Sequence, residues 1–159
     1  MKETSYLIAM NDSQSATSQN IHETLTIVAT AKDEAALLED LLRQIFHHTD
    51  GIPRERESQD SPAPEGEIVG FRATGKEIIE LLAETVGAAL DEAEVQQVTI
   101  TGVDLAGMMA TDSGIRSWGY LATKERTAPR PRAMLVGSAT VLTDNDHFRA
   151  EVLLEIDRS

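Results

Sequence analysis

Residues 29–38 read ATAKDEAALL and residues 73–82 read ATGKEIIELL, so the two stretches align without a gap at an offset of 44 positions. Each stretch follows apolar residues typical of a strand and leads into apolar residues at the spacing of an amphipathic helix. The sequence therefore predicts two similar strand–helix units. Two explanations stay open: an internal repeat, or the chance similarity of two strands that each lead into a capped helix.

The first unit is predicted as a strand over Leu25–Thr30 and a helix over residues 33–48. Its apolar side chains recur at i, i+1, i+4, i+5, i+8 and i+9, which places them on one face. These are Leu37, Leu38, Leu41, Leu42, Ile45 and Phe46. The charged residues Glu34, Glu39, Asp40 and Arg43 are predicted on the opposite, solvent-facing side. Asp50-Gly51, followed by Pro53, predicts the end of the helix.

The second unit is predicted as a strand over Glu67–Thr74 and a helix over residues 76–92. The helix has the apolar residues Ile78, Ile79, Leu81, Leu82, Val86, Ala89 and Leu90. Thr74 and Glu77 have the spacing of a capping box, in which the hydroxyl and the carboxylate bind backbone amides at a helix start.

The last third of the chain predicts strands instead of helices. Strands are expected over residues 95–103 and 119–122, and a β-hairpin over 133–156 with its turn at Asp144–Asp146. Leu105–Trp118 has no clear period. The predicted fold class is α+β: two strand–helix repeats with both helices on one face of a mixed or antiparallel sheet, closed by the C-terminal β-hairpin.

The chain length of 159 residues fits one domain. We expect a flexible N-terminal arm over residues 1–20, because that stretch contains a polar run without a helix or strand period. A single α/β domain is expected over 21–159. Within it, residues 53–66 form an exposed connector, since they contain three prolines and almost no apolar side chain.

Charge and composition restrict the classes of function. Twenty-seven acidic residues against 14 basic ones give a net charge of −13, which disfavours direct binding to nucleic acid. One short segment is basic in spite of the acidic net charge, with Lys124, Arg126, Arg130 and Arg132. There are no cysteines, which excludes disulfides and thiolate metal sites. No apolar stretch has the length of a membrane span or of a signal-peptide core, and a cytoplasmic location is expected.

Several segments resemble the archease family. Gly70-Phe71-Arg72-Ala73-Thr74-Gly75, followed by Glu77 and Leu81-Leu82, resembles the opening strand and helix of that family. Residues 29–42 resemble its other strand–helix segment, and 139–156 are similar to its closing pair of strands. The two strand–helix units occur here in the opposite order, which indicates a permutation or a duplication.

The resemblance implies an archease-like fold, and archeases are metal-dependent cofactor proteins for RNA ligation in tRNA splicing. Their His-Thr-Ala-Asp run, whose aspartate binds the metal, corresponds here to Glu65-Gly66-Glu67-Ile68. Ile68 therefore replaces the ligand, and the family's C-terminal acidic ligand falls on Glu155. The metal candidates that remain are Glu65, Glu67 and Glu155, and we expect no bound metal, no cofactor and no catalytic residue.

Three other polar groups have a simple structural explanation beside a functional one. His47, His48 and Asp50 contain metal-ligating side chains, or they end a helix whose dipole favours histidine. Asp144, Asp146 and His147 gather acidic groups, or they form a hairpin turn. Residues 111–114 place a serine near an aspartate without the motif of a serine hydrolase, which favours a turn.

Met108, Met109 and Trp118 are residue types that serve either as core or as an adaptable binding surface. The predicted function is an archease-like accessory or self-associating module without catalytic activity, which binds a protein partner or forms a homo-oligomer. The alternative function is the metal-dependent cofactor for RNA ligation that the resemblance implies.

Overall fold

The computed structural model describes residues 22–53, 67–126, 131–144 and 146–157. The elements in chain order are β1 (His22–Ala31), α1 (Glu34–Asp50), β2 (Ile68–Gly75), α2 (Ile78–Gln96), β3 (Val98–Thr111), β4 (Gly114–Glu125), β5 (Arg132–Asp144) and β6 (His147–Asp157). The chain is therefore α+β, as predicted. The arm expected over residues 1–20 and nearly all of the connector expected over 53–66 lie outside the described residues.

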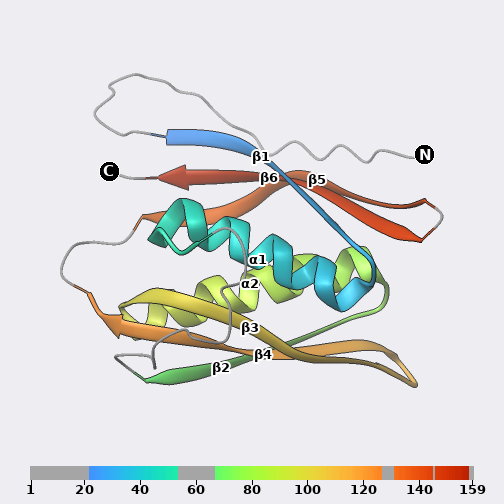
Figure 1. Ribbon diagram of the computed structural model, residues 1–159, viewed down its shortest axis with the longest axis horizontal. Coiled ribbons are helices and arrows are strands. Elements are labelled where there is room, and N and C mark those ends of the chain that lie inside the picture. The colour runs from blue at the N-terminus through green and yellow to red at the C-terminus, as the bar shows by residue number, and fades with distance from the viewer. Residues whose placement is uncertain (1–21, 54–66, 127–130, 145, 158–159) are drawn as a thin grey trace.

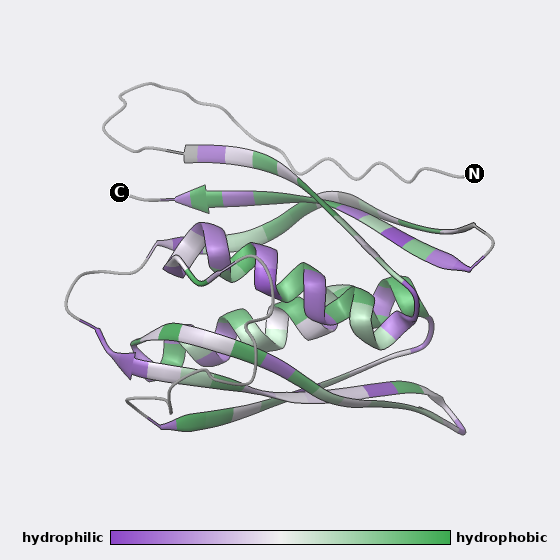
Figure 2. Ribbon diagram, in the orientation of Figure 1, coloured by the Kyte–Doolittle hydropathy of each residue, from purple (hydrophilic) through white to green (hydrophobic). Residues whose placement is uncertain are grey.

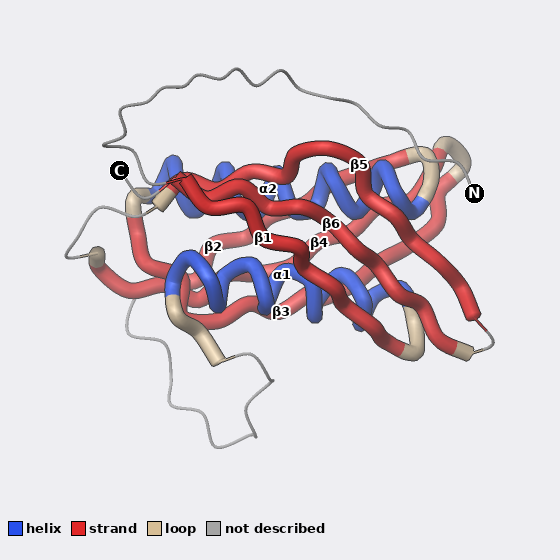
Figure 3. Tube along the Cα trace, turned by 90° about the horizontal axis from the view of Figure 1, so that it is seen from above, coloured by secondary structure: helices blue, strands red, loops and turns tan. Residues whose placement is uncertain are grey.

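The strands form two antiparallel sheets, and the helices lie between them in one layer (Figures 1 and 3). The first sheet has the order β1-β6-β5 and is called the β1 sheet here; the second has the order β2-β4-β3 and is called the β2 sheet. The expectation of a single sheet was therefore wrong. Each helix contacts both sheets, because α1 packs on β1, β6 and β3 and α2 packs on β2, β4 and β5.

The two strand–helix units keep their offset of 44 positions in the structure. β1 ends at Ala31 and β2 ends at Gly75. Asp33 and Glu77, which stand two residues later, are the N-caps of the two helices, with nearly identical backbone angles. In both sheets this first strand pairs with the second strand of a β-hairpin, β5–β6 or β3–β4. Descent of the two units from one repeat stays a prediction.

The helix termini differ in part from the expectations. In α1 the carboxylate of Asp33 accepts a hydrogen bond from the Ala36 amide at 2.8 Å, and Gly51 ends the helix with φ of 81°. The capping box predicted for α2 is wrong, because the N-cap is Glu77 and its side chain makes no capping bond. The Lys76 amide donates instead to Glu80 Oε1 at 2.7 Å.

Arg43 is buried, although the period of α1 predicts it on the solvent side. The reason is the second sheet, which covers this side of the helix. Arg43 Nη2 donates to the Val103 carbonyl of β3 at 2.9 Å and to Glu39 Oε2 at 3.1 Å. Glu39 Oε1 accepts from the Leu105 amide at 3.1 Å, so a partly buried ion pair links α1 to the backbone of an edge strand.

The segment without a sequence period, residues 105–118, is an antiparallel hairpin. β3 and β4 meet at a turn after Thr111, where Gly114 has φ of 156°. The register of β3 shifts between Ile100 and Gly102 and again between Leu105 and Gly107. Each β-bulge changes which side chains point inward, so the alternation in the sequence is broken. The predicted C-terminal hairpin, β5–β6, is confirmed.

Aliphatic side chains from both helices and both sheets form one core. Figure 2 marks hydrophobic residues along the helices and strands of both sheets. Leu37 and Leu38 of α1 and Leu81 and Leu82 of α2 have no solvent exposure. The core positions of the first unit recur 44 residues later, because Thr85, Val86, Ala89 and Leu90 are buried like their counterparts. The two Leu-Leu pairs are thus equivalent anchors of the helix layer.

Truncation of either anchor should destabilise the domain. We expect Leu38→Ala and Leu82→Ala each to lower the free energy of unfolding by about 2–5 kcal/mol, because a cavity forms between closely packed sheets. Urea denaturation monitored by circular dichroism measures this. Leu142→Ala is the matched control, since Leu142 is 41% exposed and should lose well under about 1 kcal/mol. Losses below about 1 kcal/mol at position 38 or 82 would contradict the core assignment.

Candidate protein-interaction surface

β4 alternates between buried and accessible side chains along its length. Ser117, Gly119, Leu121 and Thr123 are buried on the face toward the helices. Arg116, Trp118 and Tyr120 take the other face, because successive strand residues point to opposite sides of a sheet. Two aromatic rings and an arginine therefore stand in a row on the outside of the β2 sheet.

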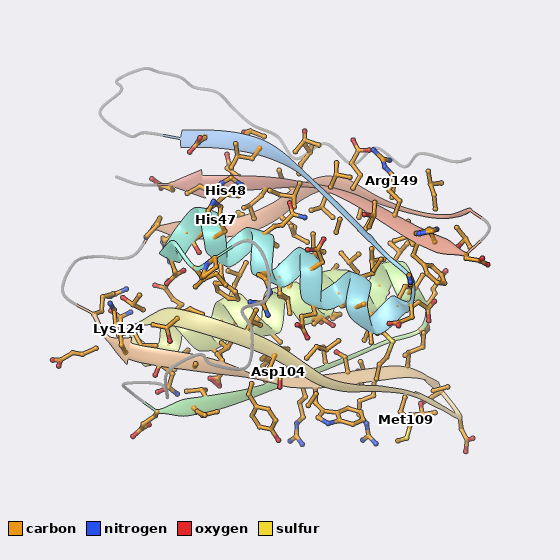
Figure 4. The ribbon with its side chains drawn as sticks, in the orientation of Figure 1. His47, His48, Asp104, Met109, Lys124 and Arg149 are labelled. Carbon is orange, nitrogen blue, oxygen red and sulfur yellow. The ribbon has the colours of Figure 1, made fainter. Side chains whose placement is uncertain are left out.

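The neighbouring strands extend this row into a patch. Trp118 pairs across the sheet with Arg72 of β2, and Arg116 pairs with Met109 of β3. We call the patch the outer surface of the β2 sheet: Ile68, Arg72, Met109, Arg116, Trp118 and Tyr120. Ile68 is 58% exposed, Tyr120 47% and Met109 45%. Figure 4 shows Met109 directed away from the helix layer. Aromatic, methionine and arginine side chains are the types enriched at protein interfaces.

Trp118 lies flat against the backbone of β3 because its neighbour there is a glycine. A Cβ atom added at Gly107 would stand 2.3 Å from Cζ2 of the indole. Met108, next to Gly107, packs against the core, while Met109 points outward. Both alternatives for this group therefore apply: Met108 is a core residue, and Met109 and Trp118 belong to a surface. Only Met109 and Trp118 contribute to the surface.

A groove of about 560 Å³ adjoins this surface. β2 lines it with Gly70, Phe71 and Arg72, and β4 with Trp118, Gly119 and Tyr120. α2 supplies the remaining lining residues: Ala88, Asp91, Glu92 and Val95. The Oε1 atom of Glu92 is buried and has no hydrogen-bond partner among the described residues. A buried carboxylate oxygen without a hydrogen-bond donor is costly, so this oxygen favours the approach of a donor.

The two acidic metal candidates that the structure describes, Glu67 and Glu155, are not brought together. Glu67 precedes β2, and its carbonyl accepts a hydrogen bond from Thr123 Oγ1 at 2.6 Å. Glu155 belongs to β6, where it pairs with Thr24 and Met134 in the other sheet. Since Glu155 alternates with buried residues, it faces away from the helix layer, and the helices separate it from Glu67. Glu65 lies outside the described residues.

The histidine pair and Asp50 stabilise the end of α1. His47 Nδ1 lies 2.7 Å from the Ile52 carbonyl, and the rings of His47 and His48 meet edge to face with centroids 5.4 Å apart. Asp50 Oδ2 accepts from the Ile100 amide at 2.9 Å. Over the described ranges, no group of three or more histidine and acidic side chains is arranged to hold a metal ion.

The two predicted turns are turns in the structure. Thr111 Oγ1 donates to the Gly114 carbonyl at 3.1 Å and accepts from the Ser113 amide at 3.3 Å, which closes the β3–β4 hairpin. Asp144 pairs with His147 at the end of the β5–β6 hairpin. Both segments therefore have the hairpin positions that a structural explanation predicts.

The predicted basic group is divided between the two sheets. Lys124 lies on β4, close to its end, and Arg126 follows it and bonds to the side chain of Gln97. Arg132 begins β5 in the other sheet, while Arg130 lies outside the described residues. These described members do not form one basic surface on a single sheet.

Comparisons with known proteins identify the fold class and no family. No family model matches the sequence, and no curated protein matches it. The structure resembles the solution structure of protein 1598 of Methanobacterium thermoautotrophicum, with a TM-score of 0.60 and 14% sequence identity over 84% of this chain and 96% of that one. At this identity the likeness shows a shared fold alone. No helix of the described part is long and apolar enough to cross a membrane.

Sequence reasoning found Trp118 and Met109 but missed Tyr120, Arg72 and Glu92. The signal for Tyr120 is the spacing Arg116, Trp118, Tyr120, which is the period of a strand. The sequence analysis predicts a strand over residues 119–122 only, so Arg116 and Trp118 were not assigned to the same strand as Tyr120. No local signal identifies Glu92, because its role depends on the position of α2 beside β2.

Gly107→Ala should expel Trp118 from its place on the sheet. The new methyl group would overlap the indole ring, so we expect a loss of about 1–3 kcal/mol in stability and a red shift of the tryptophan emission. Trp118 is the single tryptophan of the chain, so the spectrum reports this site alone. Gly102→Ala is the control, because its Cβ would make an ordinary contact of 3.6 Å with Ala122. Equal spectra for the two variants would contradict the packing described.

Proposed function

We propose that this protein is an archease-like accessory module that acts in the cytoplasm by binding another protein, without catalysing a reaction itself. The observation that carries the proposal is the outer surface of the β2 sheet, which exposes Ile68, Met109 and Tyr120 beside two arginines. Large exposed apolar side chains grouped on one face are typical of interaction sites.

The composition of this surface supports a protein partner. Tryptophan, tyrosine and arginine are the residues that most often dominate the energy of protein interfaces. Trp118 is half-buried and fixed over Gly107, so it loses little freedom when a partner covers it. The net charge of −13 opposes a phosphate backbone and favours a protein partner over a nucleic acid.

The second candidate is the metal-dependent cofactor for RNA ligation implied by the resemblance to archeases. What favours it is the match of residues 70–75 and 77–82 to that family, together with the acidic side chain at Glu155. Elemental analysis and calorimetry with Mg²⁺ and Mn²⁺ separate the candidates. Stoichiometric binding that is lost in Glu67→Ala or Glu155→Ala would favour this second function.

Capture of partners by the tagged full-length chain tests the proposed function. The double variant Met109→Ser/Arg116→Glu alters a cross-strand pair on the outer surface of the β2 sheet, and it should lower the amount of the captured partner about tenfold or more. The matched control is Leu142→Ser/Arg149→Glu, a similarly exposed cross-strand pair in the β1 sheet. It should leave capture unchanged.

Two results would contradict the proposal. One is equal loss of the partner in both double variants, which would mean that the surface has no specific role. The other is a metal-dependent activity of the purified chain. Sedimentation of the chain alone tells a homo-oligomer from a different partner, because only a homo-oligomer would dissociate in the Met109→Ser/Arg116→Glu variant.

A further inference from the structure

The two sheets have four edge strands, and three of them are protected against additional strands. β3 contains two β-bulges, and its backbone binds Glu39, Arg43 and Asp50 of α1. β5 contains a register shift between Val136 and Thr140. Bulges and covering groups are the usual means by which proteins block edge strands.

β1 is protected by one side chain of α1. Gln44 Nε2 donates to the Val28 carbonyl at 2.8 Å, and it also bonds to Asp40 Oδ2 at 3.1 Å, which fixes the amide in place. Val28 lies in the middle of β1, so this hydrogen bond covers the centre of the edge.

β2 is the exception among the four edges. Its register runs without a bulge from Ile68 to Gly75, and it contains neither proline nor lysine. No hydrogen bond from a side chain of the described residues covers the backbone of this strand. The offset of 44 explains why, because Gln44 and Val28 of the first unit correspond to Ala88 and Arg72 of the second. The methyl group of Ala88 cannot donate a hydrogen bond, and both residues line the groove.

The chemistry of the groove indicates what it accepts. Its α2 side contributes two carboxylates, Asp91 and Glu92, against the single guanidinium of Arg72. The buried Oε1 atom of Glu92 has no donor among the described residues. Carboxylates therefore outnumber the guanidinium in the lining of the groove, and the net charge of −13 adds to the attraction for a basic segment.

We propose that the free edge of β2 binds an extended basic segment of a partner protein, which joins the β2 sheet as an additional antiparallel or parallel strand. Its backbone pairs with β2, and an inward basic side chain donates to Glu92. Outward apolar side chains pass over Gly70 toward Tyr120, whose ring lies 3.8 Å from a Cβ built at that glycine. Strand addition of this kind takes affinity from the backbone and specificity from alternate side chains. This inference rests on the proposed function and names the place and chemistry of the partner.

A synthetic peptide tests the inference on the full-length chain. The probe is an eight-residue peptide of alternating lysine and valine with blocked ends, which matches the length of β2. Binding is followed by the fluorescence of Trp118, which lines the groove. We expect saturable binding, and we expect it to fall about tenfold or more when lysine is replaced by glutamate or when alternate backbone amides are methylated.

Three variants of the protein sharpen the test. Ala88→Gln transfers the edge-covering side chain of the first unit to the second and should weaken binding of the peptide about tenfold or more. Glu92→Gln removes the acceptor charge and should have a similar effect. Glu84→Gln makes the same charge change at an exposed position of α2 outside the groove, so it should bind within about twofold of the parent chain. Thermal unfolding confirms that each variant folds.

The outcomes that overturn the inference are distinct. If the glutamate peptide binds as tightly as the lysine peptide, the groove does not select a basic segment. If the methylated peptide binds as tightly, the peptide does not join the sheet as a strand. If no peptide binds, the groove is not a peptide site. A dimer of the chain that Ala88→Gln converts to a monomer would show that the occupant is a second copy. If capture of a partner fails in Met109→Ser/Arg116→Glu but survives in Ala88→Gln and Glu92→Gln, the groove inference is wrong and the proposed function stands.

Discussion

The burial of two helices between two sheets is the constraint on which the rest of the structure depends. A helix that packs on a single sheet needs one apolar stripe, whereas α1 and α2 must satisfy a sheet on each side. The Leu-Leu pairs at 37–38 and 81–82 supply this, because adjacent helix positions point about 100° apart and so reach toward different neighbours. Loss of the layer would leave both sheets with an exposed apolar face.

Because each helix lies between two sheets, some polar side chains of α1 face a sheet and bind its backbone. The side of α1 that turns toward β3 contains Glu39 and Arg43, and an unpaired charge there would be costly. The two side chains pair with each other and with the backbone of β3, so an edge strand provides the remaining hydrogen bonds. The same hydrogen bonds thus satisfy the ion pair and protect the edge of β3. Through them α1 also helps to hold the two sheets together.

The helices, the C-terminal hairpin and the fold class could be predicted because their apolar periods are local. The 3.6-residue period of residues 37–46 indicates a helix whatever the number of sheets that pack around it. The number of sheets could not be predicted, because it depends on which strands pair at long range. The strand period from Arg116 to Tyr120 could not be recognised because the buried positions between these residues are Ser117 and Gly119, so apolar and polar side chains do not alternate there as in a strand with one apolar face. The groove could not be predicted either, since Glu92 meets β2 only in three dimensions.

The two strand–helix units have similar scaffolds that differ in structure at few positions. The strand ends, the N-cap positions and the buried apolar positions of residues 37–46 agree at the offset of 44. The difference lies at the edges, where Gln44 binds the backbone of β1 and its counterpart Ala88 has no side-chain donor for β2. Natural proteins avoid open, regular edge strands because such strands promote aggregation. Among the described residues, no side chain covers the edge of β2 and no donor reaches Glu92 Oε1, which is the arrangement that the proposed partner strand would complete. The asymmetry between the two sheets therefore adds to the support that the outer surface of the β2 sheet gives to the proposed interaction function.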